Sequence, residues 1–194
     1  MREQKNQIRQ ILRQRKDAMT PKDRLLKSQQ ICHHVMKLIR DHETVMVFTS
    51  KEKEVNTEPL INALFKRNNP VVVPIIEKED ISLRLSYLRD FSALVPSTFG
   101  VPEPIGNEIP ADANDISTII LPMLGFDRTG GRIGYGAGYY DRFLSKNQNM
   151  RKIGVIFACQ EVDNLPVDEN DIRMDYIITE DGIVYRGEMV SDGD

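Results

Sequence analysis

The chain has 194 residues, 40% of them hydrophobic and 28% charged, which is typical of a domain with a hydrophobic core. Its 26 Lys and Arg against 29 Asp and Glu give a formal net charge of −3, so no overall basic field would attract nucleic acid or membranes. Its apolar runs fall far short of the ~20 residues of a membrane span, and its polar start is unlike a signal peptide. Cys32 and Cys159 form no ligand pattern and fit thiols in a reducing compartment. We therefore expect a single domain over residues 1–194, monomeric and cytoplasmic.

The first half of the chain predicts two helices, then a strand, a third helix and two further strands. These elements span residues 2–17, 21–39, 44–49, 57–67, 71–73 and 81–87. Apolar residues recur at helical spacing in the first two segments, and the strand segments are rich in β-branched residues or alternate with polar ones. Thr20, Pro21 and Asp23 supply an N-cap, a proline at the first helical position and an acidic third position.

The second half predicts a proline-rich loop and then more strands with one helix. The loop covers residues 90–114, strands cover 118–122, 152–158 and 176–179, a helix starts near Tyr139, and 183–186 adds an edge hairpin. Strands that alternate with helices indicate an α/β fold, with a mostly parallel central sheet flanked by helices on both faces in three layers. In such sheets ligands bind at the carboxyl ends of the strands.

The most informative stretch is a glycine run, in which five of the 12 glycines fall between Gly130 and Gly138. The run lies between the strand at 118–122 and the helix at Tyr139. Glycines that lead into a helix N-terminus present free N–H groups and a positive dipole end, an arrangement typical of phosphate sites. The spacing fits neither a Walker A motif nor a Rossmann fingerprint. A tight turn without a ligand stays open as the alternative.

Charged residues near this run have two readings each. Arg132 could bind phosphate in bidentate fashion or be a surface arginine. Asp141 could stabilise the helix N-terminus or hold Mg²⁺. The acidic segment 165–171 could supply a second magnesium ligand or be a polar surface loop. Glu54 follows a predicted strand at the same edge of the sheet, but composition cannot show which of the charged residues 51–54 would belong to a site. Basic residues on the first helix, such as those at positions 5 and 9, could bind phosphate or form a solvated face.

Leu121 to Arg128, followed by the glycine run and Tyr139 to Arg142, resembles the 5-formyltetrahydrofolate cyclo-ligase family. Weaker matches follow the family's order at Lys5–Arg9, Glu54–Thr57, Gly100–Pro104 and Pro166–Asp171, followed by Asp175. The resemblance implies an ATP- and Mg²⁺-dependent ring closure, in which 5-formyltetrahydrofolate becomes 5,10-methenyltetrahydrofolate with release of ADP and phosphate. The formyl oxygen would attack the γ-phosphate to give an imidate-type phosphate. N10 would then close on the activated carbon, and phosphate would leave.

The resemblance also implies a role for individual residues. Those carried over for ATP are Lys5, Arg9, Arg132, Ile133, Gly134, Tyr135, Gly136, Ala137, Gly138, Tyr139 and Tyr140. Those carried over for the folate are Arg9, Thr49, Glu54, Tyr135, Gly136, Ala137, Gly138 and Tyr139. Catalysis would depend on Lys5, Arg9 and Arg132, and the metal on Asp141 and Asp171. The chain departs from the family pattern mildly, at Ile8, Thr49 and Ala137.

Two other functions remain compatible with the residues. One is a different ATP-dependent enzyme, such as a small-molecule kinase or ligase on a similar scaffold. The other is a folate- or nucleotide-binding module without catalysis, although a binder does not need two metal carboxylates.

Overall fold

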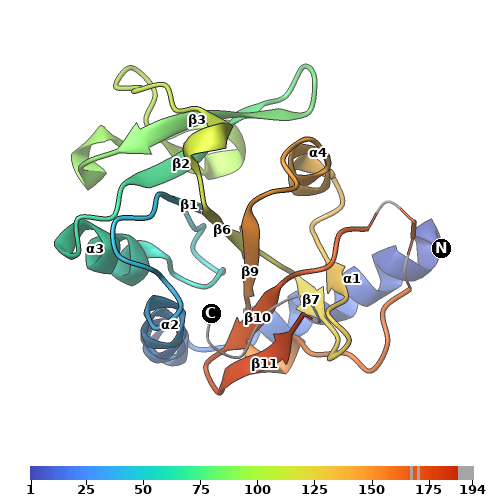
Figure 1. The fold of residues 1–194 in the computed structure, drawn as a ribbon. Helices are drawn as coiled ribbons and strands as arrows, with labels where there is room; N and C mark the ends of the chain where they lie inside the picture. Colours follow the sequence, from blue (N-terminus) through green and yellow to red (C-terminus); the bar gives the residue numbers. More distant parts are fainter. Residues whose placement is uncertain (167, 170, 188–194) are drawn as a thin grey trace.

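The structure is a computed structural model that describes residues 1–166, 168–169 and 171–187, and it is built on a seven-stranded sheet (Figure 1). The strand order is β11-β10-β9-β6-β1-β2-β3, in which the five inner strands are parallel to their neighbours and the two edge strands, β3 and β11, are antiparallel. The strands are β1 (Val45–Val47), β2 (Val71–Glu77), β3 (Ser82–Leu88), β6 (Thr118–Pro122), β9 (Arg151–Val155), β10 (Tyr176–Thr179) and β11 (Gly182–Arg186).

Helices cover both faces of the sheet, which confirms the predicted fold class. They are α1 (Arg2–Asp17), α2 (Pro21–Met36), α3 (Glu58–Lys66) and α4 (Tyr139–Lys146). Figure 1 shows α2 and α3 on one side of the sheet and α4 on the other. Because successive strand residues point to opposite faces, Val45 and Val47 pack in the core cluster that α2 and α3 join, whereas Met46 packs in a second cluster with Phe143 and Leu144 of α4. Among the described residues, no helix is long and apolar enough to span a membrane.

Local sequence signals located most of these elements. The hydroxyl of Thr20 accepts a hydrogen bond from the N–H of Asp23 at 3.1 Å, so the predicted N-cap of α2 is confirmed. The helix ends at Met36 rather than Ile39, and Leu25 and Leu26 are about half exposed rather than part of the core. Strand β2 continues through Pro74 to Glu77, whereas the prediction ended the strand at residue 73.

Short elements outside the main sheet were not predicted, and two of them shape the site. They are β4 (Val95–Pro96) paired with β5 (Pro102–Glu103), β7 (Gly125–Phe126) paired with β8 (Arg132–Ile133), and the 3-10 turns Phe91–Ala93, Thr98–Gly100, Ala113–Asp115 and Ala158–Gln160. The β7–β8 hairpin packs on α1, since Leu12 shares a buried cluster with Leu124 and Ile133. This contact brings the first helix of the chain beside the glycine run.

Candidate active site

A cavity of about 670 Å³ lies at the edge of the sheet where the parallel strands β1 and β6 end. Three parts of the chain supply most of its wall: the glycine run with the start of α4, the segment 48–54 after β1, and α1 through Arg9 and Lys16. Phe99 and Val101, from the connection between β4 and β5, add an apolar side. The sequence placed ligands at this edge, and the cavity lies there.

The glycine run rests on a buried carboxylate. Oδ1 of Asp127 accepts hydrogen bonds from the N–H groups of Thr129 and Gly131, each at 3.0 Å, and from the Thr129 hydroxyl at 2.6 Å. Oδ2 accepts the N–H of Leu165 at 2.9 Å. Burial alone would raise the pKa of Asp127, but these hydrogen bonds outweigh it and lower the pKa. The carboxylate therefore stays charged and fixes residues 127–131 as a rigid base.

The second half of the run is open toward the cavity. Gly136 and Gly138 have φ of 107° and 78°, a left-handed conformation that a residue with a Cβ adopts only with strain. Gly138 is the N-cap of α4, so the positive end of this helix faces the cavity. Within the described residues, the N–H groups of 134–138 donate no hydrogen bond to the protein. These donors fit the phosphate-binding reading of the run.

Arg132 is buried in the cavity wall, which decides against the surface-arginine alternative. Only 6% of its side chain is exposed, and Nη1 donates to Oδ1 of Asp141 at 3.1 Å. Its Nε is buried without a hydrogen-bond partner among the described residues. Arg132 thus keeps unused donor capacity next to the open N–H groups of the run.

Helix α1 brings two more cations to this region. Arg9 lines the cavity, and its Nε donates to the carbonyl oxygen of Gly134 at 2.8 Å. One turn earlier, Nζ of Lys5 lies 3.0 Å from Oδ2 of Asp171, so the structure joins two predicted site residues that are 166 positions apart. Lys5 and Asp171 lie outside the cavity wall, and the side chain of Ile133 is buried in the cluster with Leu12.

Glu54, from the segment after β1, also lines the cavity. Its Oε1 accepts the N–H of Lys51 at 2.8 Å, and the Tyr135 hydroxyl lies 3.5 Å from Oε2. Burial raises the pKa of Glu54, and the backbone hydrogen bond and nearby lysines oppose this only in part. Burial and the Glu54 carboxylate also raise the pKa of Tyr135, so the phenol is neutral and can donate. The Thr49 hydroxyl donates to the carbonyl of Pro102 at 2.6 Å and so holds the β4–β5 connection against this wall.

Sequence reasoning missed Lys16, which is only 8% exposed and lines the same cavity. Its Nζ lies 5.1 Å from the centre of the Tyr135 ring. Lys16 follows Leu12 by four residues, so it continues the buried stripe of α1, and a lysine on that stripe was the available signal.

No group of three or more His, Cys, Asp or Glu that could hold a metal occurs within residues 1–166, 168–169 and 171–187. The two carboxylates predicted for Mg²⁺, Asp141 and Asp171, are each paired with a cation predicted for phosphate, Arg132 and Lys5.

Comparison with known proteins identifies relatives along almost the whole chain. The model of the "5-formyltetrahydrofolate cyclo-ligase family" matches residues 1–180. A 5-formyltetrahydrofolate cyclo-ligase of Escherichia coli is 32% identical over 179 residues, covering 87% of this chain and 96% of the relative. One from Haemophilus influenzae is 29% identical over 181 residues, covering 89% and 95%. The solution structure of Aquifex aeolicus 5,10-methenyltetrahydrofolate synthetase has a TM-score of 0.82 and 25% identity, covering 96% of this chain and 94% of that one.

Proposed function

This chain belongs to the 5-formyltetrahydrofolate cyclo-ligase family, and we propose that it uses ATP and Mg²⁺ to convert 5-formyltetrahydrofolate into 5,10-methenyltetrahydrofolate. ADP and phosphate are the other products. The observation that carries the ATP part of this proposal is the buried Arg132, whose Nε has no partner in the described residues, beside a run of free backbone N–H groups. Such a combination of a guanidinium, amides and a helix N-terminus suits phosphate oxygens.

The chemistry explains why phosphate is needed. The oxygen of an amide-like formyl group leaves poorly as water, and N10 cannot close the ring until that oxygen is activated. In the proposed first step the formyl oxygen bonds to the γ-phosphorus and the bond to ADP breaks. N10 then adds to the activated carbon and loses its proton to water, and the C–O bond breaks to release phosphate. Phosphoryl transfer needs alignment and charge neutralisation more than a protein nucleophile, and none is required here.

The cations around the glycine run would neutralise the transferred group. Arg132 and the N–H groups of 134–138 line the cavity directly, so we assign them to the ATP phosphates. Arg9 lies against the carbonyl of Gly134 and can reach both the phosphates and the folate. Lys5 lies one turn before Arg9 on the same helix, outside the cavity wall, and we assign it to the phosphates as well.

Asp141 and Asp171 fit a magnesium ion by donor type and access. Carboxylate oxygens are hard ligands, and Mg²⁺ is commonly held by one or two of them together with phosphate oxygens and water. Their side chains are 36% and 28% exposed, so both can be reached from solvent. Bound Mg²⁺ would supply charge neutralisation at the phosphates. Because Arg132 and Lys5 now pair with these carboxylates, we expect each cation to turn toward phosphate when the carboxylate takes the metal.

The folate would occupy the other side of the cavity. Glu54 can accept hydrogen bonds from the N–H groups of the pterin, and Thr49 and residues 135–139 complete that wall. Apolar side chains from the segment after β1 and from the β4–β5 connection, Phe48, Phe99 and Val101, give the ring system an apolar surface.

A phosphate-release assay with and without 5-formyltetrahydrofolate tests the proposal. We expect ATP-dependent growth of the methenyl absorbance, with one phosphate released for each ring closed and none released without folate. Release without folate would favour a different ATP-dependent enzyme. Folate binding with no release under any condition would favour a binding module.

A further inference from the structure

Lys16 holds a charged group in a position that the fold does not need. The residue is only 8% exposed, and Nζ makes no hydrogen bond or ion pair in the part of the chain that the structure describes. Its one polar contact is with the face of the Tyr135 ring, 5.1 Å from the ring centre. Burial of an ammonium without a carboxylate partner is unfavourable, and burial accordingly lowers the pKa of Lys16. A group kept in this state at the wall of a cavity suggests a ligand.

The charges around Lys16 leave its ammonium free for that ligand. Asp17, the next residue, attracts Lys16 but forms no ion pair with it, and its Oδ1 lies 3.8 Å from Nζ of Lys53. Arg13 and Arg24 are on the same side and repel Lys16. Glu54 attracts it but forms no ion pair with it, and both residues line the cavity.

Lys16 and Glu54 flank the same aromatic ring. The Tyr135 hydroxyl lies 3.5 Å from Oε2 of Glu54, while Nζ of Lys16 lies over the ring. The wall therefore presents a cationic donor next to a carboxylate whose two oxygens have accepting capacity left. A complementary ligand edge carries one acceptor followed by two donors.

The pterin of a reduced folate has such an edge, with the C4 carbonyl oxygen, the N3–H and the 2-amino group in order. We propose that Lys16 donates a hydrogen bond to the pterin C4 carbonyl oxygen while Glu54 accepts from the neighbouring N–H groups. This assignment rests on the proposed function, since it places the folate at the Glu54 wall. It makes Lys16 a residue that determines specificity for the 4-oxo pterin.

The test replaces Lys16 by methionine, which keeps length and removes the charge, with Lys22→Met as control. Lys22 is exposed in the first turn of α2 and does not line the cavity. For Lys16→Met we expect the KM for 5-formyltetrahydrofolate to rise about 10- to 100-fold, as for loss of a charged hydrogen bond, with the KM for ATP within about twofold of wild type. Because a buried, unpaired ammonium is lost, the Tm should stay level or rise.

A pair of inhibitors gives a readout that a structural role would not move. Folic acid carries the 4-oxo group, and its 4-amino-4-deoxy analogue carries a donor there instead. We expect the preference of the wild type for folic acid to fall about tenfold in Lys16→Met and to be unchanged in Lys22→Met. An unchanged preference, or an equal rise in both KM values, would overturn the assignment, and a selective rise in the KM for ATP would place Lys16 on phosphate. If the wild type neither binds nor converts the folate, the proposed function itself fails.

Discussion

Arg132 and Arg151 are both largely buried, with 6% and 13% of the side chain exposed, but they use their hydrogen-bond donors very differently. Arg151, at the start of β9, donates to the Thr118 hydroxyl at 3.2 Å and to the carbonyl of Leu38 at 2.6 Å. It also pairs with Glu43 at 3.4 Å, and only its Nη1 is left without a partner. Arg132 has one protein partner, Asp141, in the described residues. Arg151 joins parts of the fold, whereas Arg132 faces a cavity with donors to spare.

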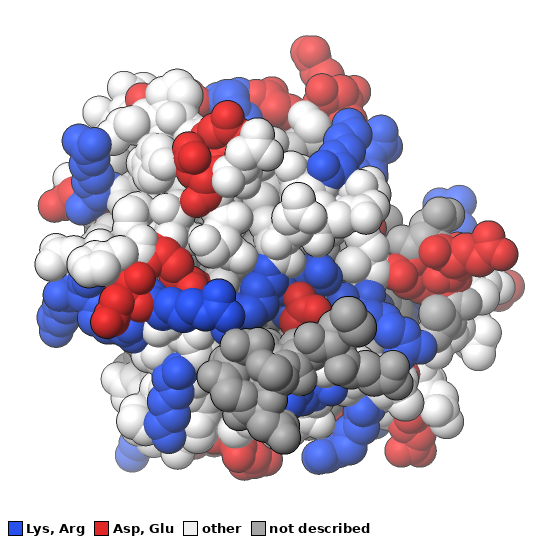
Figure 2. All heavy atoms as spheres, in the orientation of Figure 1, with Lys and Arg blue, Asp and Glu red and all other residues white. Residues whose placement is uncertain are grey.

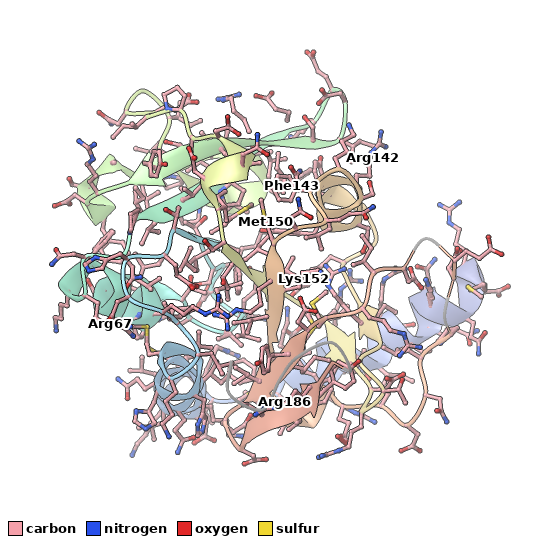
Figure 3. The ribbon with its side chains drawn as sticks, viewed as in Figure 1. Arg67, Arg142, Phe143, Met150, Lys152 and Arg186 are labelled. Carbon is pink, nitrogen blue, oxygen red and sulfur yellow. The ribbon has the colours of Figure 1, made fainter. Side chains whose placement is uncertain are left out.

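The surroundings of the two arginines show the same contrast. Basic side chains form a band across the face seen in Figure 2, with acidic side chains among them. Figure 3 labels two cations, Arg67 and Lys152, near the starts of the parallel strands β2 and β9. They pair with Asp41 at 3.0 Å and with Asp175 at 3.4 Å. At the opposite edge, Lys16 and part of Arg132 remain unpaired in the described chain. Arg24 and Arg151 also each have one buried nitrogen without a partner, but both donate to several groups of the fold. At the cavity, Arg132 bonds one protein group and Nζ of Lys16 bonds none in the described residues.

The largest effect that we expect comes from Arg132→Ala. Loss of a phosphate-binding cation should lower kcat by about 10²- to 10³-fold, as for other groups that stabilise charge in a transition state. The Tm should stay within about 2 °C of wild type, because one ion pair with a partly exposed carboxylate contributes little to stability. Arg142→Ala, an exposed arginine on α4 (Figure 3), is the control and should retain full activity. A parallel loss of Tm and activity would make Arg132 a structural arginine like Arg151.

Arg151→Met should produce the opposite pattern. The change leaves Glu43, whose side chain is 6% exposed, without its cation. Removal of one partner of a buried pair costs roughly 3–5 kcal/mol, which corresponds to a fall in Tm of about 10 °C for a chain of this size. Activity per folded molecule should remain near wild type below the new Tm. The double variant Arg151→Met/Glu43→Gln should recover part of the Tm, and no recovery would mean that Glu43 is not what Arg151 stabilises.

Asp127→Asn tests whether the base of the glycine run needs a carboxylate. The amide nitrogen cannot accept, so hydrogen bonds from Thr129, Gly131 or Leu165 would be lost, at about 1–3 kcal/mol for a donor left unsatisfied. We expect a smaller fall in Tm than for Arg151→Met, together with a higher KM for ATP because residues 134–138 lose their rigid base. Denaturant unfolding and ATP titration measure the two effects. A normal KM would show that the open half of the run holds its shape alone.

The sequence predicted what local patterns control. Periodicity and capping located α1 and the start of α2, and glycine spacing located the run that enters α4. Local patterns do not identify the partner of a charged side chain, so the sequence could not decide whether Arg132 lies on the surface or in a site. Only the family resemblance assigned Lys5 and Asp171 to the same site. The β7–β8 hairpin was missed because its two-residue strands depend on Asp127 and on packing against Leu12, neither of which has a periodic signal.

Glu54→Gln gives the smallest effect and extends the contrast to a carboxylate. Burial raises the pKa of Glu54 in the folded state, so this group contributes stability below its unfolded pKa of about 4.3 and loses it as pH rises through the folded value. At pH 7 the glutamine variant should therefore be more stable than wild type, with a higher Tm. The gain should vanish as pH falls to 4, while folate binding weakens at neutral pH. Thermal melts of both proteins between pH 4 and pH 8 test this. A difference in Tm that persists at pH 4, or a loss of stability at pH 7 like that of Arg151→Met, would mean that Glu54 stabilises the fold. A gain in Tm that depends on pH would mean that the charge of Glu54 destabilises the fold, as expected of a residue that binds a ligand.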